Sequence, residues 1–137
     1  MKFLFPLGRV LFSLIFITAA PRHFTTEGIQ HAATLGVPAA AVLVPLSGVM
    51  ALAGGISVAV GLKARWGAYV LAGFLLPVTW WMHAFWKLSD PVAIHIETAM
   101  FAKNLTMLGA ALLISQFGAG SFSLDERRGE KPTPLAH

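Results

Sequence analysis

The sequence predicts an all-α integral membrane protein, a four-helix bundle with a short interfacial helix between the first two spans. Of its 137 residues, 56% are hydrophobic and only 12% are charged, about half the charged fraction of a soluble domain, which is near 25%. Apolar residues run continuously instead of alternating, which argues against strands. Four segments approach or exceed the roughly 20 residues that a helix needs to cross a bilayer.

The four spans are predicted at residues 3–20, 39–62, 66–86 and 99–117. The first span resembles a secretory signal peptide, but Arg9 inside its apolar stretch favours a retained helix. Pro45 and Pro77 lie inside the second and third spans, where neighbouring helices can satisfy the carbonyl groups that a proline frees. The second and third spans must be antiparallel neighbours, because very few residues join them.

The other connections are longer and more polar. In the first of them, Thr26 is expected to cap a helix over residues 27–35, which Gly36 and Pro38 end. This helix is expected to lie flat at the membrane interface. The second connection, residues 87–98, contains Ser89-Asp90-Pro91 as a turn and helix start. The membrane domain then covers residues 1–124, and the charged tail 125–137 is expected to fray.

The basic residues predict the topology. An even number of spans places both termini on one side, and that side holds seven of the ten Lys and Arg residues: Lys2, Arg9, Lys63, Arg65, Arg127, Arg128 and Lys131. The positive-inside rule therefore predicts cytoplasmic termini in a bacterial inner membrane. The net charge of +4 is read as this topology signal, and no nucleic-acid partner is expected.

Two features indicate how the helices associate. Ser47, Ala51, Gly55 and Ala59 recur at four-residue intervals, a stripe of small residues that lets helix backbones approach in lipid. Arg9 is costly inside a membrane helix. We expect it to form a structural ion pair with Asp125, which reaches the same cytoplasmic boundary.

A polar cluster is predicted at the outer side. His83 lies near the end of the third span, and Glu97, Lys103 and Asn104 lie near the start of the fourth, with His95 close by. Ionisable groups in lipid usually face a cavity and often mark function. Three interpretations remain open: ordinary interfacial residues, a site for a small molecule or quinone headgroup, and a metal or haem site. The metal reading ranks last, because no two histidines show ligand spacing on one helix.

Other chemistry finds little support in the sequence. Cysteine is absent, which excludes disulfides and thiolate metal sites. The chain also has no phosphate-binding loop, nucleophile elbow or zincin motif. No metal is therefore expected, and a redox role would need a bound cofactor or a partner protein.

Several short motifs together resemble the DoxX family of small bacterial membrane proteins. The resemblance extends from about residue 7 to residue 125 and rests on Gly8-Arg9, Gly36-Val37-Pro38, Gly54-Gly55, Gly61-Leu62 with Arg65, His83-Ala84-Phe85-Trp86, Phe101-Ala102-Lys103-Asn104-Leu105 with Gly109, Phe117-Gly118-Ala119-Gly120 and Ser123-Leu124-Asp125. In one respect the chain departs from the family. Many members carry a glutamate at the position of Ala51, so a role for that carboxylate does not transfer.

The resemblance implies a four-helix inner-membrane protein associated with oxidoreductase systems. Members are linked to a thiosulfate–quinone oxidoreductase and to a membrane redox complex with superoxide dismutase and a sulfurtransferase. The first hypothesis is therefore an accessory or anchoring subunit with no catalytic activity of its own. It would contact lipid and a redox partner, or a second copy of itself. The alternatives are an independent membrane oxidoreductase that binds a quinone or, less favoured, haem, and a small permease or lipid-handling protein.

Overall fold

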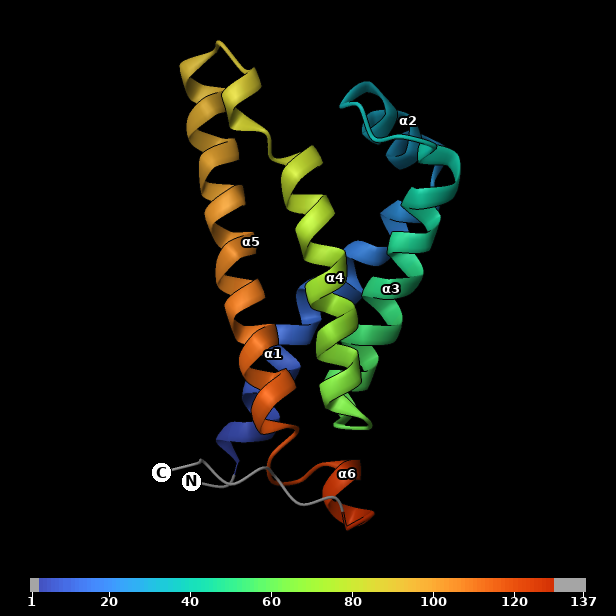
Figure 1. The fold of residues 1–137 in the computed structure, drawn as a ribbon, viewed down its shortest axis with the longest axis vertical. Helices are drawn as coiled ribbons and strands as arrows, with labels where there is room; N and C mark the ends of the chain where they lie inside the picture. Colours follow the sequence, from blue (N-terminus) through green and yellow to red (C-terminus); the bar gives the residue numbers. More distant parts are fainter. Residues whose placement is uncertain (1–2, 130–137) are drawn as a thin grey trace.

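The computed structural model describes residues 3–129, and within that range the chain is helical with no strand. The predicted all-α fold class is confirmed. In chain order the elements in Figure 1 are α1 (Leu4–Ala19), η1 (Ala20–Phe24), α2 (Thr26–Thr34), α3 (Ala40–Val60), α4 (Ala64–Met82), η2 (Phe85–Lys87), α5 (Pro91–Phe117) and α6 (Leu124–Arg127).

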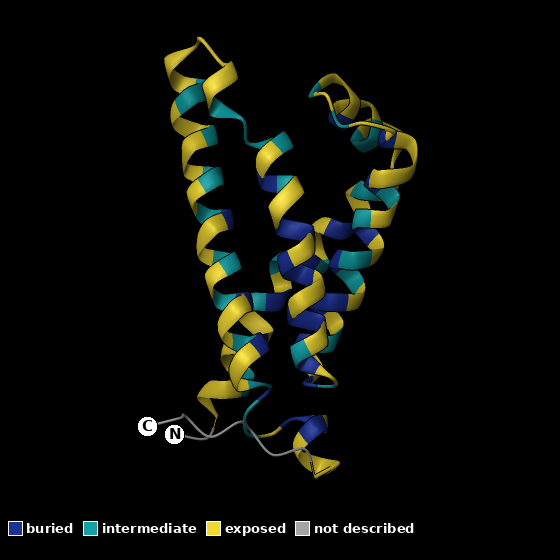
Figure 2. Ribbon diagram, viewed as in Figure 1, coloured by how far each residue is buried: buried dark blue, intermediate teal, exposed yellow. Residues whose placement is uncertain are grey.

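Within residues 3–129, four segments are long and apolar enough to span a membrane: Leu4–Phe24, Ala40–Val60, Ala64–Lys87 and Pro91–Phe117. In each of these segments, at most 33% of an apolar stretch of 18 residues is buried inside the protein. Figure 2 shows the exposed residues on the outward faces of the long helices. Outward apolar faces of this kind suit helices that contact lipid tails.

The long helices pack in a row, with α1 against α3, α3 against α4, and α4 against α5. The start of α1, the α3–α4 turn and α6 lie together at one end of the molecule, which we call the basal end (Figure 1). The opposite, distal end carries η1, α2 and η2. There the α4–α5 pair diverges from α3 and α2 (Figure 1).

Glycines allow the closest helix contacts. A Cβ atom on Gly55 of α3 would lie 3.0 Å from Ile17 Cγ1 of α1. At the α3–α4 crossing, a Cβ atom on Gly67 would lie only 2.4 Å from Ser57 Oγ and 3.1 Å from the carbonyl oxygen of Gly54. Without a hydrophobic force between helices in lipid, such backbone approach is a main source of packing energy.

The small-residue stripe proposed for α3 coincides only partly with the buried face of that helix. Ala51 and Gly55 are buried, whereas Ser47 and Ala59 are half-buried. The buried face of α3 consists of Ala40, Val44, Gly48, Ala51, Gly54, Gly55 and Val58. Four elements, α1, η1, α2 and α4, pack on this helix, so its buried surface is wider than a single line of residues.

One helix start differs from the sequence expectation and another agrees with it. Thr25, not Thr26, caps α2, and its Oγ1 accepts a hydrogen bond from the Gly28 amide at 3.0 Å. The fourth long helix begins at Pro91, as the Ser89-Asp90-Pro91 motif predicted, although the fourth span was placed only from residue 99; the Asp90 carboxylate accepts a hydrogen bond from the Ala93 amide at 2.8 Å. A capped start with proline in the first turn makes the polar residues 91–98 helical.

The tail also differs from the expectation of fraying. Residues 124–127 form α6, and Ser123 caps this helix by accepting a hydrogen bond from the Glu126 amide. Asp125 is only 7% exposed, so the first tail residues belong to the packed structure. The rest of the predicted tail, residues 130–137, lies outside the described residues.

The glycine contacts predict that Gly67→Ala destabilises the protein by about 1–3 kcal/mol, the usual cost of overpacking. The added methyl would press on Ser57 and on the α3 backbone. Thermal unfolding in detergent, followed by circular dichroism, measures the change. Gly109→Ala is the matched control, because nothing lies within 4 Å of its Cβ position. This control should be neutral or slightly stabilising, as alanine favours helix. Equal effects of the two changes would contradict the packing account.

Candidate functional site

A cavity of about 690 Å³ lies at the distal end, between η1, α2, α3, α4 and α5. This volume is within the range of small-molecule sites, about 300–1,000 Å³. Of the predicted polar cluster, His83, Glu97 and Lys103 line the cavity. The other two members do not belong to its lining: His95 is exposed, and Asn104 is buried within the bundle.

His83 and Glu97 form one wall. His83 follows the last residue of α4, and its Nδ1 lies 2.7 Å from Oε2 of Glu97 in the second turn of α5. Both side chains are partly shielded, with 20% and 31% of their surfaces exposed. The two helices run antiparallel, which brings the end of one and the start of the other to the same depth. The pair therefore ties α4 to α5 beside the cavity.

Lys103 lies six residues further along α5 and is half-buried. No carboxylate lies within ion-pair distance of its ammonium group among residues 3–129. Glu97, the carboxylate that shares the lining, is bound to His83 instead. The cavity thus contains a cation that has no counter-ion from the described part of the chain.

His23 was not among the residues predicted for the site. Its Nδ1 lies 2.7 Å from Ser47 Oγ, and the Ser47 hydroxyl donates to the Val44 carbonyl at 2.6 Å. This contact joins η1 to α3 beside the cavity, which both residues line. The imidazole also packs on Phe74, with ring centroids 5.7 Å apart. Residue spacing could not reveal this pair, because His23 and Ser47 lie on separate elements with α2 between them in the chain.

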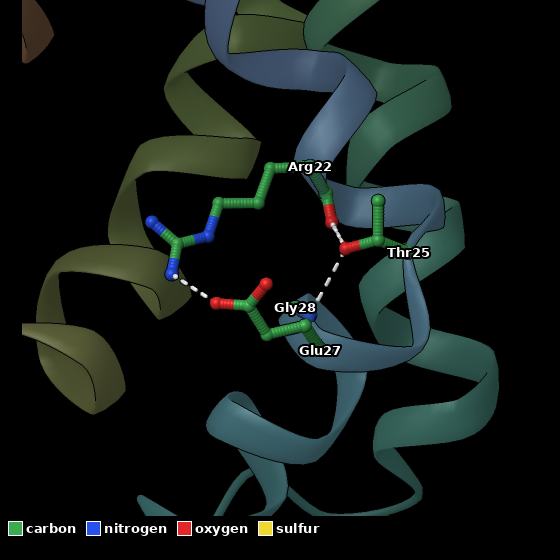
Figure 3. A network of polar contacts seen from close by, with 4 residues as sticks. All are labelled: Arg22, Thr25, Glu27 and Gly28. Carbon is green, nitrogen blue, oxygen red and sulfur yellow. Dashed lines mark hydrogen bonds and ion pairs between the residues drawn. The ribbon is translucent and has the colours of Figure 1, made fainter.

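Arg22 and Gly28, at the corner between η1 and α2, line the cavity. Figure 3 shows the polar contacts of this corner. Thr25 Oγ1 donates to the Arg22 carbonyl at 2.8 Å while it caps α2 through the Gly28 amide. A Cβ atom on Gly28 would lie 2.1 Å from the Arg22 carbonyl oxygen, so this tight corner requires glycine. Arg22 and Glu27 approach to 3.6 Å, but both are exposed, and such pairs contribute little to stability.

The metal or haem reading gains no support from this geometry. Among the described residues, no three histidine, aspartate or glutamate side chains converge on a position that could hold a metal ion. His83 lines the cavity, whereas His95 does not. These two histidines of the predicted cluster therefore do not line the same cavity.

A second polar assembly fixes the basal end. Arg9 is 5% exposed, and its guanidinium donates to the carbonyls of Ala119, Ser121 and Phe122, the last at 2.9 Å. The expected direct ion pair with Asp125 is not formed. In the loop between α5 and α6, backbone carbonyls reach both terminal nitrogens of the guanidinium first, while Nε is buried without a hydrogen-bond partner among the described residues.

Asp125 instead caps α4. Its Oδ1 accepts from the Lys63 amide at 2.6 Å and its Oδ2 from the Ala64 amide at 3.0 Å. The Asp125 amide in turn donates to the Gly61 carbonyl at 2.8 Å. Free N–H groups and the positive end of the helix dipole attract a carboxylate to this position. We call Arg9, the turn 61–64 and the segment 118–125 the basal clamp.

Comparison with known proteins places this architecture. Residues 4–84 match the model of the DoxX family. The chain belongs to the DoxX family. Two Escherichia coli relatives align along nearly the whole chain. Inner membrane protein YqjF is 30% identical over 126 residues, 90% of this chain and 91% of the relative, and inner membrane protein YphA is 29% identical over 123 residues, 88% and 87% of the two chains. No solved structure matches.

The DoxX match covers only part of the site. It includes Arg9, His23 and Ser47 and ends just after His83, whereas Glu97 and Lys103 lie beyond it. Both E. coli relatives extend over most of the remaining chain. This DoxX protein is therefore a multi-pass membrane protein whose distal cavity combines residues inside and outside the matched segment.

The basal clamp predicts that Asp125→Ala lowers the free energy of unfolding by about 2 kcal/mol, because two backbone N–H groups lose a charged acceptor. Chemical or thermal unfolding of purified protein in detergent measures the loss. Arg127→Ala, an exposed change on the same short helix, is the control and should have little effect. An Asp125→Ala protein as stable as the wild type would contradict the capping role.

Proposed function

We propose that this DoxX protein is an accessory subunit of the inner membrane, with both termini in the cytoplasm, that anchors or assists a quinone-linked oxidoreductase. The distribution of basic residues supports this orientation. Arg9, Lys63, Arg65, Arg127 and Arg128 belong to the basal end, while the predicted contributions of Lys2 and Lys131 lie outside the described residues. An excess of basic residues is typical of the cytoplasmic side.

The distal end offers the contact surface for such a partner, and this observation carries the proposal. Trp80 and Trp86 pack together with ring centroids 4.9 Å apart, and Trp86 also packs on Phe101 of α5. Trp80 is nevertheless 60% exposed. Aromatic residues are enriched both at protein interfaces and at membrane boundaries. Here they adjoin the wall of the cavity that His83 and Glu97 form.

The chemistry of the chain agrees with an accessory role. It has no cysteine, so electron transfer would depend on a partner or on a bound cofactor. The specific observation that His83 and Lys103 line one cavity favours a second candidate, an independent quinone-binding oxidoreductase. Lipid extraction with mass spectrometry and visible absorption separate the candidates, because the second requires a quinone retained by the purified protein alone.

Purification under mild detergent tests the proposed role. Tagged protein should copurify a membrane oxidoreductase, identified by mass spectrometry and by its electron-transfer activity. Trp80→Ala with Trp86→Ala should strongly reduce that recovery by removing the distal aromatic surface. Trp66→Ala is the matched control at the basal end, where the side chain is 70% exposed, and it should retain the partner. Recovery of only a monomer or homo-oligomer, or equal loss in both variants, would contradict the proposal.

A further inference from the structure

We propose that the distal cavity binds an amphiphile with an anionic headgroup, a phosphate or a carboxylate, which pairs with the ammonium group of Lys103. This inference goes beyond the accessory role and does not depend on it. It rests on the balance of charge in the cavity lining and on the combination of polar and apolar residues that line it.

The charges of the lining do not balance. Arg22 and Lys103 are the Lys and Arg residues of the lining, and Glu97 is the one carboxylate among the lining residues described. Glu97 binds His83 at 2.7 Å, and Arg22 approaches Glu27, which lies outside the lining. Lys103 alone among these charged groups has no partner in the described chain. A cation within a membrane-spanning helix is costly and normally pairs with a counter-charge, so an anionic ligand would supply what the protein lacks.

Further polar groups surround the same space. His23 of η1 lines the cavity and binds Ser47 through Nδ1. His31 of α2 is exposed and lines the cavity as well. An imidazole can accept from the hydroxyl of a singly protonated phosphate or, when protonated, donate to the anion. These groups suit an oxygen-rich headgroup at the distal boundary.

The deeper lining is apolar. Met50 and Phe74 line the cavity and lie near the midpoints of α3 and α4. Val78 and Trp81 continue this surface toward the distal end. Lys103 itself lies near the midpoint of α5, so the cavity brings its ammonium group together with apolar side chains at the middle of the spans, while Arg22, His31, His83 and Glu97 line the distal part. A small inorganic anion would leave the apolar part unused, and a neutral lipid would leave Lys103 unpaired.

Binding to protein in phosphatidylcholine nanodiscs tests the proposal, with empty nanodiscs as the blank. Isothermal calorimetry at neutral pH compares four probes: dodecyl phosphate, dodecanol, inorganic phosphate and decylubiquinone. Dodecyl phosphate should bind saturably, and each of the other three should bind at least about tenfold more weakly, since each lacks the headgroup charge or the alkyl chain. Equal binding of any of the three would overturn the proposal.

Variants assign the charge to Lys103. Lys103→Met keeps the length of the side chain and should weaken dodecyl phosphate binding at least about tenfold, while Lys103→Arg should retain most of it. Lys87→Met removes an exposed lysine outside the lining and should leave the affinity unchanged. Removal of an unpaired ammonium should not unfold the helices, which circular dichroism checks. Unchanged affinity in a folded Lys103→Met protein, or equal losses at Lys87 and Lys103, would overturn the assignment.

Discussion

The burial of Arg9 inside α1 is the constraint on which the arrangement of this bundle depends. A guanidinium in a membrane helix needs acceptors, and the carbonyls of residues 119, 121 and 122 provide them. The segment after α5 must therefore return to the first helix. Asp125 then fixes this same segment to the α3–α4 turn through two backbone amides. One short loop thus joins the start, the middle and the end of a chain whose long helices otherwise pack as a row.

The basal clamp holds the helices together at the basal end, and the distal end contains the cavity. There α4 and α5 are held together by His83 and Glu97, while η1 is held to α3 by His23 and Ser47. Each bond joins helices on one side of the cavity, and neither one crosses it. The cavity is consequently bounded by one wall that His83 and Glu97 hold and another that His23 and Ser47 hold, and the two meet where His23 packs on Phe74 of α4. Lys103 lines the space between them. In this arrangement the polar residues of a small membrane protein divide into a structural group at one end and a candidate binding group at the other.

The sequence predicted the four spans and the meeting of His83 with Glu97, because hydrophobic length and antiparallel depth follow directly from residue order. It could not predict that Arg9 would bind backbone carbonyls instead of Asp125, because the positions of those carbonyls depend on the path of the glycine-containing loop between α5 and α6. His23 was missed for a related reason: a histidine in a connecting segment has no periodicity that relates it to Ser47. The helix start at Ser89-Asp90-Pro91 was predicted, but the fourth span was placed only from residue 99, because the polar residues 91–98 carry no membrane signal. The structure was therefore needed to identify contacts between residues on different elements, whereas the helices themselves could be predicted from the sequence.

A double-mutant cycle between Arg9→Met and Asp125→Ala tests the central claim most directly, with unfolding free energies measured in the same detergent. If the loop acts as one tie held from both sides, releasing either side frees it. The double variant should then be only slightly less stable than the less stable of the two single variants. The coupling energy should be close to the smaller of the two single losses in unfolding free energy, within the range of about 0.5–3 kcal/mol seen for residues of one network. Additive losses from the two changes would show that Arg9 and Asp125 stabilise separate parts of the protein and would contradict the account.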